Sequence, residues 1–286
     1  MIELNRIETT EEALRKGCQA LLEHGIGSGA LEASILLGMA TGLDRLALIT
    51  HPSRPLSPSE KETFLSLLER RFRHEPIQYL KGTQEFMGLS FVVRPGVLIP
   101  RPDTEILVEA VLDACEEYES PRIVDVGTGS GAIAVSLKAF LPRASVTATD
   151  LSPEALAVAR ENAQRNDADV LFFEGSGLAP LEGRVFDFFV SNPPYIPSEE
   201  VLTLDSEVKD YEPRLALDGG EDGLDWYRLF AKEAGRFLVP GGWIFLEVGA
   251  DQAPEVKKLL EENEWREVGT REDLSGIERV VFGRKG

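Results

Sequence analysis

A four-residue segment, Asn192, Pro193, Pro194 and Tyr195, combines residue types that could orient a planar nitrogen for attack. A carboxamide nitrogen is a poor nucleophile because its lone pair is delocalised, and the amide rotation barrier of about 18–20 kcal/mol measures that delocalisation. The side-chain oxygen of Asn192 and the carbonyl of Pro193 could accept hydrogen bonds from such a nitrogen and stabilise its developing positive charge. The prolines stiffen the backbone, and the ring of Tyr195 could stack on the planar group. The alternative interpretation is a structural turn.

A second segment, rich in glycine, has the composition of a loop that binds a ligand through its backbone. It lies between a predicted strand and a predicted helix, and it comprises Gly127, Thr128, Gly129, Ser130 and Gly131. Asp150 ends the next predicted strand about 20 residues later, where an acid can accept hydrogen bonds from two ribose hydroxyls. With Ala132 the spacing also satisfies the looser dinucleotide fingerprint, so a nicotinamide dinucleotide and S-adenosylmethionine are both candidate ligands. A glycine turn that only packs a helix on a sheet is the alternative.

The elements that position these residues alternate between strand and helix from residue 122 onward. The predicted strands cover residues 122–126, 145–149, 170–173, 186–191, 243–248 and 279–283, and the predicted helices cover 130–140, 152–166 and segments near 222–238 and 252–263. This alternation predicts a doubly wound α/β sheet with helices on both faces. The glycine segment, Asp150 and Asn192 all follow the C-terminal ends of strands, where open α/β sheets bind ligands.

The first 82 residues predict a small helical domain instead. Residues 57–60 have a capping-box pattern, with Ser57 as the N-cap and Glu60 reaching back to it. The helical spacing of apolar residues ends after this region. Residues 85–100 instead alternate between apolar and polar side chains and contain glycines and prolines, as a hairpin or linker would. We therefore expect two domains, 1–82 and 83–286, with Asp103 as the N-cap of the helix that follows the linker.

The composition restricts the class of protein. The 286 residues carry a net charge of −19, with 11 acidic and 10 basic side chains in residues 1–84 and 38 acidic and 20 basic in the rest. Phosphate backbones are bound by clustered Lys and Arg, so this acidity argues against a duplex nucleic acid substrate. The N-terminus predicts no secretory signal, and no apolar run is long enough to span a membrane. Cys18 and Cys115 alone predict neither a disulfide framework nor a metal site, and we expect a cytoplasmic protein.

Three stretches, "DVGTGSGA", "ATD" and "SNPPYI", together resemble class I S-adenosylmethionine-dependent methyltransferases that act on amino groups. The flanking stretches "LIPRPDTE" and "GGEDGL" are more specific and resemble the release-factor glutamine methyltransferase family. The resemblance implies methylation of the side-chain amide nitrogen of the glutamine in the Gly-Gly-Gln motif of peptide chain release factors. It also implies a seven-stranded methyltransferase sheet, a helical N-terminal substrate-recognition domain and a β-hairpin linker. The expected partners are release factors, without direct nucleic acid or membrane binding.

The same resemblance assigns roles to residues. Asn192, Pro193 and Tyr195 are implied to be catalytic and, with Pro194, to bind the substrate. The cofactor positions are Gly127, Thr128, Gly129, Ser130, Gly131, Asp150 and Asn192. Family members often carry an acid after the third strand, where it meets the adenine amino group. Ser176 stands in that place here with Gly177 beside it, so we expect Gly177 near the adenine. No metal is expected.

Two other activities remain open from the residues. The Asn-Pro-Pro-Tyr tetrad is shared with DNA adenine N6-methyltransferases, and the glycine spacing is shared with nicotinamide-dependent oxidoreductases. Some polar residues also have two interpretations: Arg101, Asp103 and Glu105 could line the pocket or only begin a helix, and Glu247 could face the cofactor cleft or only end a strand. We expect Arg70, Arg71 and Arg73 on a solvated helix face, although this cluster could also dock a protein partner. We favour the core for Phe86 over a lid, and the core for Trp226, Trp243 and Trp265 over stacking platforms.

Overall fold

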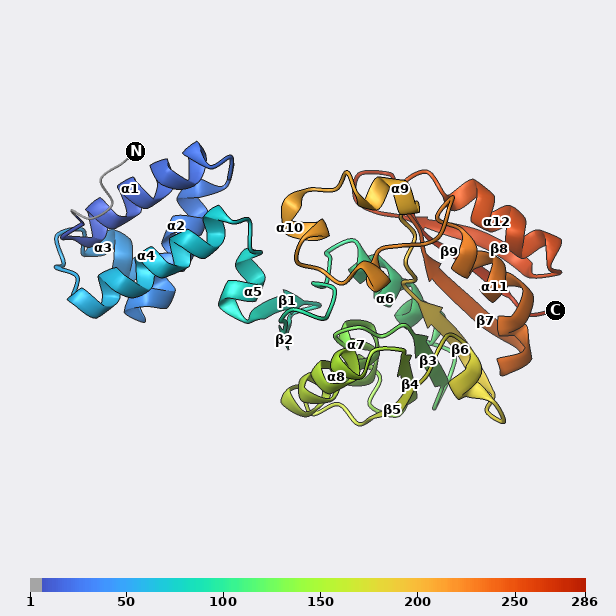
Figure 1. The fold of residues 1–286 in the computed structure, drawn as a ribbon. Helices are drawn as coiled ribbons and strands as arrows, with labels where there is room; N and C mark the ends of the chain where they lie inside the picture. Colours follow the sequence, from blue (N-terminus) through green and yellow to red (C-terminus); the bar gives the residue numbers. More distant parts are fainter. Residues whose placement is uncertain (1–6) are drawn as a thin grey trace. The chain divides into compact units, whose positions relative to one another are not determined.

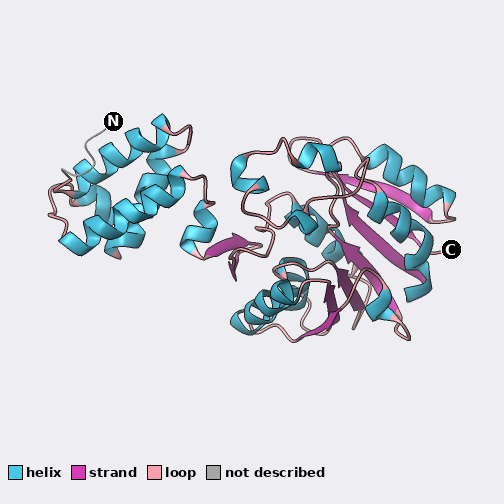
Figure 2. Cartoon of the chain, viewed as in Figure 1, coloured by secondary structure: helices cyan, strands magenta, loops and turns pink. Residues whose placement is uncertain are grey.

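The computed structural model describes residues 7–286, and the chain divides into two compact units, Met1–Lys81 and Gly82–Gly286 (Figure 1). Helices build the described part of the first unit, whereas the large sheet lies in the second (Figure 2). The expectation of no secretory signal concerns the N-terminal residues, and residues 1–6 lie outside the described part of the chain. Among residues 7–286 no helix is long and apolar enough to cross a bilayer.

The helices of the first unit are α1 (Thr10–Glu23), α2 (Gly29–Thr41), α3 (Arg45–Thr50), α4 (Pro58–Phe72) and α5 (Ile77–Lys81). Their apolar faces meet in a core that includes the fully buried Leu21, Leu36, Leu37, Phe64 and Leu68. The capping box of α4 is confirmed, because Ser57 Oγ accepts the N–H of Glu60 at 3.2 Å and the Glu60 carboxylate accepts the N–H of Ser57 at 2.7 Å. The solvated position expected for Arg71 is wrong. Arg71 is buried and pairs with Glu32 at 2.5 Å, as a buried charge requires.

The predicted hairpin is confirmed at the start of the second unit. Strands β1 (Thr83–Phe86) and β2 (Leu89–Val92) pair antiparallel, with Phe86 opposite Leu89. The two turn residues, Met87 and Gly88, both have positive φ, which is the geometry that matches the twist of a two-residue hairpin. Asn162 of α8 (Pro153–Arg165) fixes this hairpin to the rest of the second unit, because its side chain exchanges hydrogen bonds of 2.6 and 3.0 Å with the backbone of Val92.

A seven-stranded sheet forms the centre of the second unit (Figure 1). Its strands are β3 (Arg122–Val126), β4 (Ser145–Asp150), β5 (Val170–Glu174), β6 (Phe186–Ser191), β7 (Leu238–Glu247), β8 (Arg266–Glu272) and β9 (Glu278–Arg284). The spatial order is β5-β4-β3-β6-β7-β9-β8. The strands from β5 to β7 pair parallel, whereas β9 pairs antiparallel with both of its neighbours, β7 and β8. The chain therefore reverses its direction of winding between β3 and β6, which is the switch point where such sheets bind ligands.

Helices cover both faces of this sheet, as the alternation predicts. The longer ones are α6 (Thr104–Ala114), α7 (Ala132–Phe140), α8 (Pro153–Arg165), α11 (Asp225–Glu233) and α12 (Ala253–Glu262). The shorter ones are α9 (Ser198–Val201), α10 (Ser206–Lys209) and the 3-10 turns η2 (Ala179–Leu181), η3 (Arg214–Ala216) and η4 (Ala234–Phe237). Side chains alternate along a strand, so Phe188 packs with α6 and α7 on one face, while Phe189 packs with α11 and α12 on the other.

Two local expectations differ from the structure. Strand β8 is absent from the prediction because its sequence, "REVGTRE", has no apolar run. It lies at the sheet edge, where polar and charged residues are normal.

Asp103 occupies the position before α6, but its backbone is already helical and its side chain makes no capping hydrogen bond, so the prediction that Asp103 caps this helix is wrong. Its carboxylate instead pairs with Arg279 at 3.0 Å, because β9 brings a cation to this helix start.

Candidate active site

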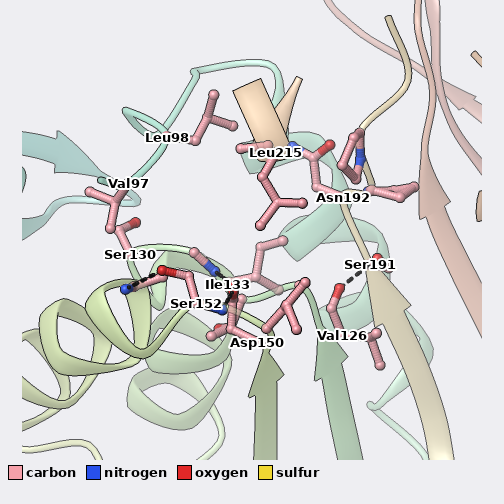
Figure 3. Close-up of a pocket in the computed structure, with 18 of the residues that line it drawn as sticks. Val97, Leu98, Val126, Ser130, Ile133, Asp150, Ser152, Ser191, Asn192 and Leu215 are labelled. Carbon is pink, nitrogen blue, oxygen red and sulfur yellow. Dashed lines mark hydrogen bonds between the residues drawn. The ribbon is translucent and has the colours of Figure 1, made fainter. Parts of the chain in front are cut away.

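A cavity lies at the carboxyl ends of β3, β4 and β6, where the switch point predicts it (Figure 3). Most of the residues that the sequence selects line its wall: Gly127, Thr128, Gly129, Ser130, Asp150, Gly177, Asn192, Pro193 and Pro194. Gly131 and Tyr195 are not in that wall. Parallel strand ends meet at one edge of a sheet, which is why segments more than 60 residues apart come together here.

The glycine loop is held to the neighbouring strand by its own backbone. The N–H groups of Gly127 and Thr128 both donate to the carbonyl of Thr149, each at 2.9 Å. A Cβ added to Gly127 or Gly129 would meet nothing within 4 Å, so their backbone faces open space that a ligand can fill. Gly131 serves packing instead. Its φ is +83°, and a Cβ there would lie 3.1 Å from the backbone of Ala159 in α8.

Asp150 is fixed at the end of β4 by two backbone donors. Its Oδ2 accepts the N–H of Gly129 at 2.8 Å, and its Oδ1 accepts the N–H of Ser152 at 2.9 Å. Each carboxylate oxygen can accept a second hydrogen bond, so the group remains able to bind two hydroxyls that enter the cavity. The same contacts link the orientation of this acid to the shape of the glycine loop.

A buried acid beneath the loop was not selected from the sequence. Asp125 is fully buried, accepts the Thr128 hydroxyl at 2.6 Å, and keeps its Oδ1 without a partner. Burial raises the pKa of this carboxyl to about 7. The available signal was an acid inside an otherwise apolar strand directly before the glycine loop.

Asn192 follows β6 and enters the cavity with a defined orientation. The preceding Ser191 donates its hydroxyl to the carbonyl of Val126 at 2.6 Å, which ties the ends of β6 and β3 together (Figure 3). The Nδ2 of Asn192 donates to the hydroxyl oxygen of Thr104 at 3.1 Å. Its nitrogen is therefore engaged by α6, and its oxygen remains as the acceptor for a ligand.

The backbone of Pro194 and Tyr195 is held from outside the cavity. A Cβ on Gly219 would lie 2.7 Å from the carbonyl of Pro194, and one on Gly223 would lie 2.3 Å from the carbonyl of Tyr195. Only glycine permits so close an approach, which gives the "GGEDGL" stretch a physical role. Gln252 adds a hydrogen bond of 2.9 Å to the Tyr195 carbonyl. The Tyr195 ring packs against the apolar cluster around α11 and α12, and burial raises its pKa to about 12.

The far end of the cavity is aromatic. Trp226 and Phe230, one turn apart on α11, line it together with Gly175 and Gly177. Trp226 is partly buried and packs against the core cluster as expected, and its ring also reaches this wall, where it stands 3.3 Å from where a Cβ of Gly177 would be. Ser176, the residue at the position of the family acid, is not in the wall.

The segment between the hairpin and α6 closes one side of the cavity. Val97, Leu98 and Arg101 line it, and Arg101 forms an ion pair with the buried Glu212, which also accepts the N–H of Ile99 at 3.1 Å. Burial raises the pKa of Glu212. The other two candidates of "RPDTE" do not line the cavity. Asp103 pairs with Arg279, and Glu105 accepts the N–H of Met87 in the hairpin turn at 2.6 Å.

Comparison with known proteins identifies the family. Residues 12–82 match the PrmC N-terminal domain, and residues 99–207 match the methyltransferase small domain. The chain is 47% identical over 266 residues to the release factor glutamine methyltransferase of Geobacter sulfurreducens, covering 93% of each chain. It is 49% identical over 253 residues to that of Moorella thermoacetica, covering 88% of this chain and 89% of the other. This chain belongs to the release factor glutamine methyltransferase family. A methyltransferase from Pyrococcus furiosus has the same fold, with a TM-score of 0.54 at 20% identity, over 76% of this chain and 98% of that one.

Membership of this family resolves the choice that the residues left open. The protein is an S-adenosylmethionine-dependent methyltransferase, and the relatives support neither a DNA adenine methyltransferase nor a nicotinamide-dependent oxidoreductase. The cavity fits that cofactor. The open glycine backbone, Asp150 and the aromatic wall at Trp226 suit a ligand with a ribose and an adenine. No group of three or more His, Cys, Asp or Glu that could hold a metal ion occurs in the described part of the chain.

Proposed function

We propose that this protein transfers the methyl group of S-adenosylmethionine to the side-chain amide nitrogen of the glutamine in the Gly-Gly-Gln motif of peptide chain release factors. The observation that carries the proposal is the orientation of Asn192. Its nitrogen is engaged by Thr104, which leaves its oxygen to accept a hydrogen bond from an amide N–H of the substrate. The family relationship supports the same substrate class.

S-adenosylmethionine supplies a methyl group made electrophilic by its sulfonium. Transfer breaks the sulfur–carbon bond, forms a nitrogen–carbon bond, and releases one proton from the nitrogen and S-adenosylhomocysteine. The side-chain oxygen of Asn192 and the carbonyl of Pro193 would hold the two N–H groups and stabilise the positive charge that builds on the nitrogen. The rings of Pro193 and Pro194 fix their φ angles, so the backbone here is stiff and the two acceptors stay in place during the reaction.

The roles of the remaining site residues follow from their positions. The glycine loop and Asp150 would bind the cofactor, and Gly177 would lie near its adenine beside Trp226. Tyr195 does not reach the cavity wall, so we assign its ring to fixing the tetrad rather than to stacking on the substrate. We propose that the helical first unit recognises the release factor, because a glutamine side chain alone offers little to select. The site of action would be the cytoplasm.

The test is mass spectrometry of a purified release factor incubated with the protein and S-adenosylmethionine. We expect one added methyl group, located on the glutamine of the Gly-Gly-Gln motif. A release factor with alanine in place of that glutamine is the matched control and should gain no methyl group. Methylation of the control, or of DNA in place of the release factor, would contradict the proposal.

A further inference from the structure

A buried acid lies beside Asn192, and the proposed function gives it no role. Glu247 ends β7, is 2% exposed and keeps its Oε2 without a hydrogen-bond partner. Strands β6 and β7 are parallel neighbours with Ser191 opposite Leu246, so Asn192 and Glu247 leave the sheet side by side. Burying a carboxyl group with an unpaired oxygen lowers the stability of the fold, so a functional role is a reason for its presence here.

Glu247, Thr104 and Asn192 lie together at the ends of β6 and β7 and the start of α6. The side chains of Thr104 and Asn192 both lower the pKa of the Glu247 carboxyl group, as donors facing it do. The Thr104 oxygen also accepts from Asn192 Nδ2 at 3.1 Å, which leaves the Thr104 hydroxyl proton to point at Glu247. Tyr227 holds the backbone here, because its hydroxyl donates to the Glu247 carbonyl at 2.8 Å. The group therefore links the ends of β6 and β7 to the start of α6.

We propose that Glu247 is the positioning residue that decides which end of the Asn192 carboxamide faces the substrate. The inference rests on the proposed function. An ionised carboxylate only accepts hydrogen bonds, so it draws the N–H end of Asn192 inward and turns the oxygen toward the cavity. A reversed carboxamide would set oxygen against oxygen at Glu247 and would present N–H groups to the N–H groups of the target amide.

The ionisation state of Glu247 should therefore make kcat depend on pH. The pKa of Glu247 is raised to about 7, mainly by burial and also by the nearby Asp103, against the lowering effects of Thr104, Arg279 and Asn192. Tyr195 and Tyr227 also face this group, and their own pKa values are raised by burial, so both are neutral near pH 7. Below that pH a protonated Glu247 can donate to the Asn192 oxygen and permit the reversed orientation. We therefore expect kcat to rise as the pH increases through about 7.

The kinetic test compares Glu247→Gln with Glu262→Gln, a matched change of an exposed acid in α12. We expect Glu247→Gln to lower kcat about 10- to 100-fold, as loss of an outer hydrogen-bond partner does, with S-adenosylmethionine affinity within about twofold of wild type. It should also abolish the rise of kcat near pH 7, whereas Glu262→Gln keeps both. A folded Glu247→Gln protein with wild-type kcat and pH profile would overturn the proposal.

Thr104→Val should lower kcat more than Thr104→Ser, which keeps the hydroxyl, and equal rates for the pair would also count against it.

A second measurement needs no methyl acceptor. Carbon-detected NMR of the Glu247 carboxyl follows its titration in the wild-type protein and in Asn192→Ala. Because the Asn192 donor lowers the pKa of Glu247, its removal should raise that pKa. An unchanged titration would refute the link between the two residues. Failure of the wild-type protein to methylate a release factor would refute only the proposed function, since the titration does not depend on it.

Discussion

The carboxylate of Asp150 accepts the N–H of Gly129 at 2.8 Å, so the acid at the end of β4 and the loop after β3 hold one shape together. The two elements that would bind the ribose and the rest of the cofactor are therefore coupled. A change at the acid would release the loop and would also remove the hydrogen bonds that we propose it makes to the ligand.

The first prediction concerns this acid. Asp150→Ala should weaken S-adenosylmethionine binding by about 1.5–3 kcal/mol, the usual contribution of hydrogen bonds to a charged group. Isothermal titration calorimetry on a folded variant measures it. Asp251→Ala, which changes an exposed acid before α12, is the control and should bind normally. Wild-type affinity in Asp150→Ala would remove the acid from the cofactor site.

The second prediction separates substrate orientation from cofactor binding. Asn192→Ala should lower kcat by a factor that corresponds to about 2.7–4 kcal/mol, as removal of a transition-state hydrogen-bond partner does. Cofactor affinity should fall much less, because the glycine loop and Asp150 are unchanged. Single-turnover rates and calorimetry distinguish the two effects. The exposed Asn263 provides the matched control, and Asn263→Ala should keep its turnover. A near-normal single-turnover rate in Asn192→Ala would exclude the orienting role.

The third prediction uses two glycines with the same backbone conformation. Gly223 and Gly183 both have a φ of +76°, but a Cβ on Gly223 would lie 2.3 Å from the carbonyl of Tyr195, whereas one on Gly183 would meet nothing within 4 Å. Gly183→Ala should cost only the conformational strain, about 1–2 kcal/mol. Gly223→Ala should lower the free energy of unfolding by more and reduce turnover as well, because the backbone of the tetrad must move. Urea denaturation and steady-state kinetics test this, and equal effects of the two changes would contradict it.

The fourth prediction concerns stability and pH. Burial raises the folded-state pKa of Asp125 from 3.8 to about 7. Between these two values the folded state binds more protons than the unfolded state, so Asp125 makes the free energy of unfolding fall as pH rises from about 4 to about 7. Asp125→Asn should make that fall shallower. Asp187, whose pKa is lowered by its hydrogen bonds to Arg122, provides the opposite case. Asp187→Asn should remove stability that the wild-type protein has above about pH 4. Chemical denaturation across this range gives both slopes, and the same change of slope in both variants would refute the assignment.

The sequence by itself determined the features whose physics is local. A strand, a glycine turn and a helix form one continuous segment, and parallel strands place their carboxyl ends at one edge, so the positions of Gly129, Asp150 and Asn192 could be predicted. The capping box at Ser57 and the hairpin before Val92 depend on neighbouring residues and could be predicted for the same reason.

Only the tertiary structure decided the features that depend on contacts between distant segments. Gly131 looks like its neighbours in the loop, but α8 places Ala159 against it and makes it a packing residue. Trp226 packs against the core as a large aromatic residue is expected to, but only the position of α11 beside Gly177 shows that its ring also reaches the cavity wall. Glu247 could have been an ordinary strand-end charge. The register of β6 and β7 sets it beside Asn192 and buries it there, because side chains far apart in the chain meet only when the sheet is assembled.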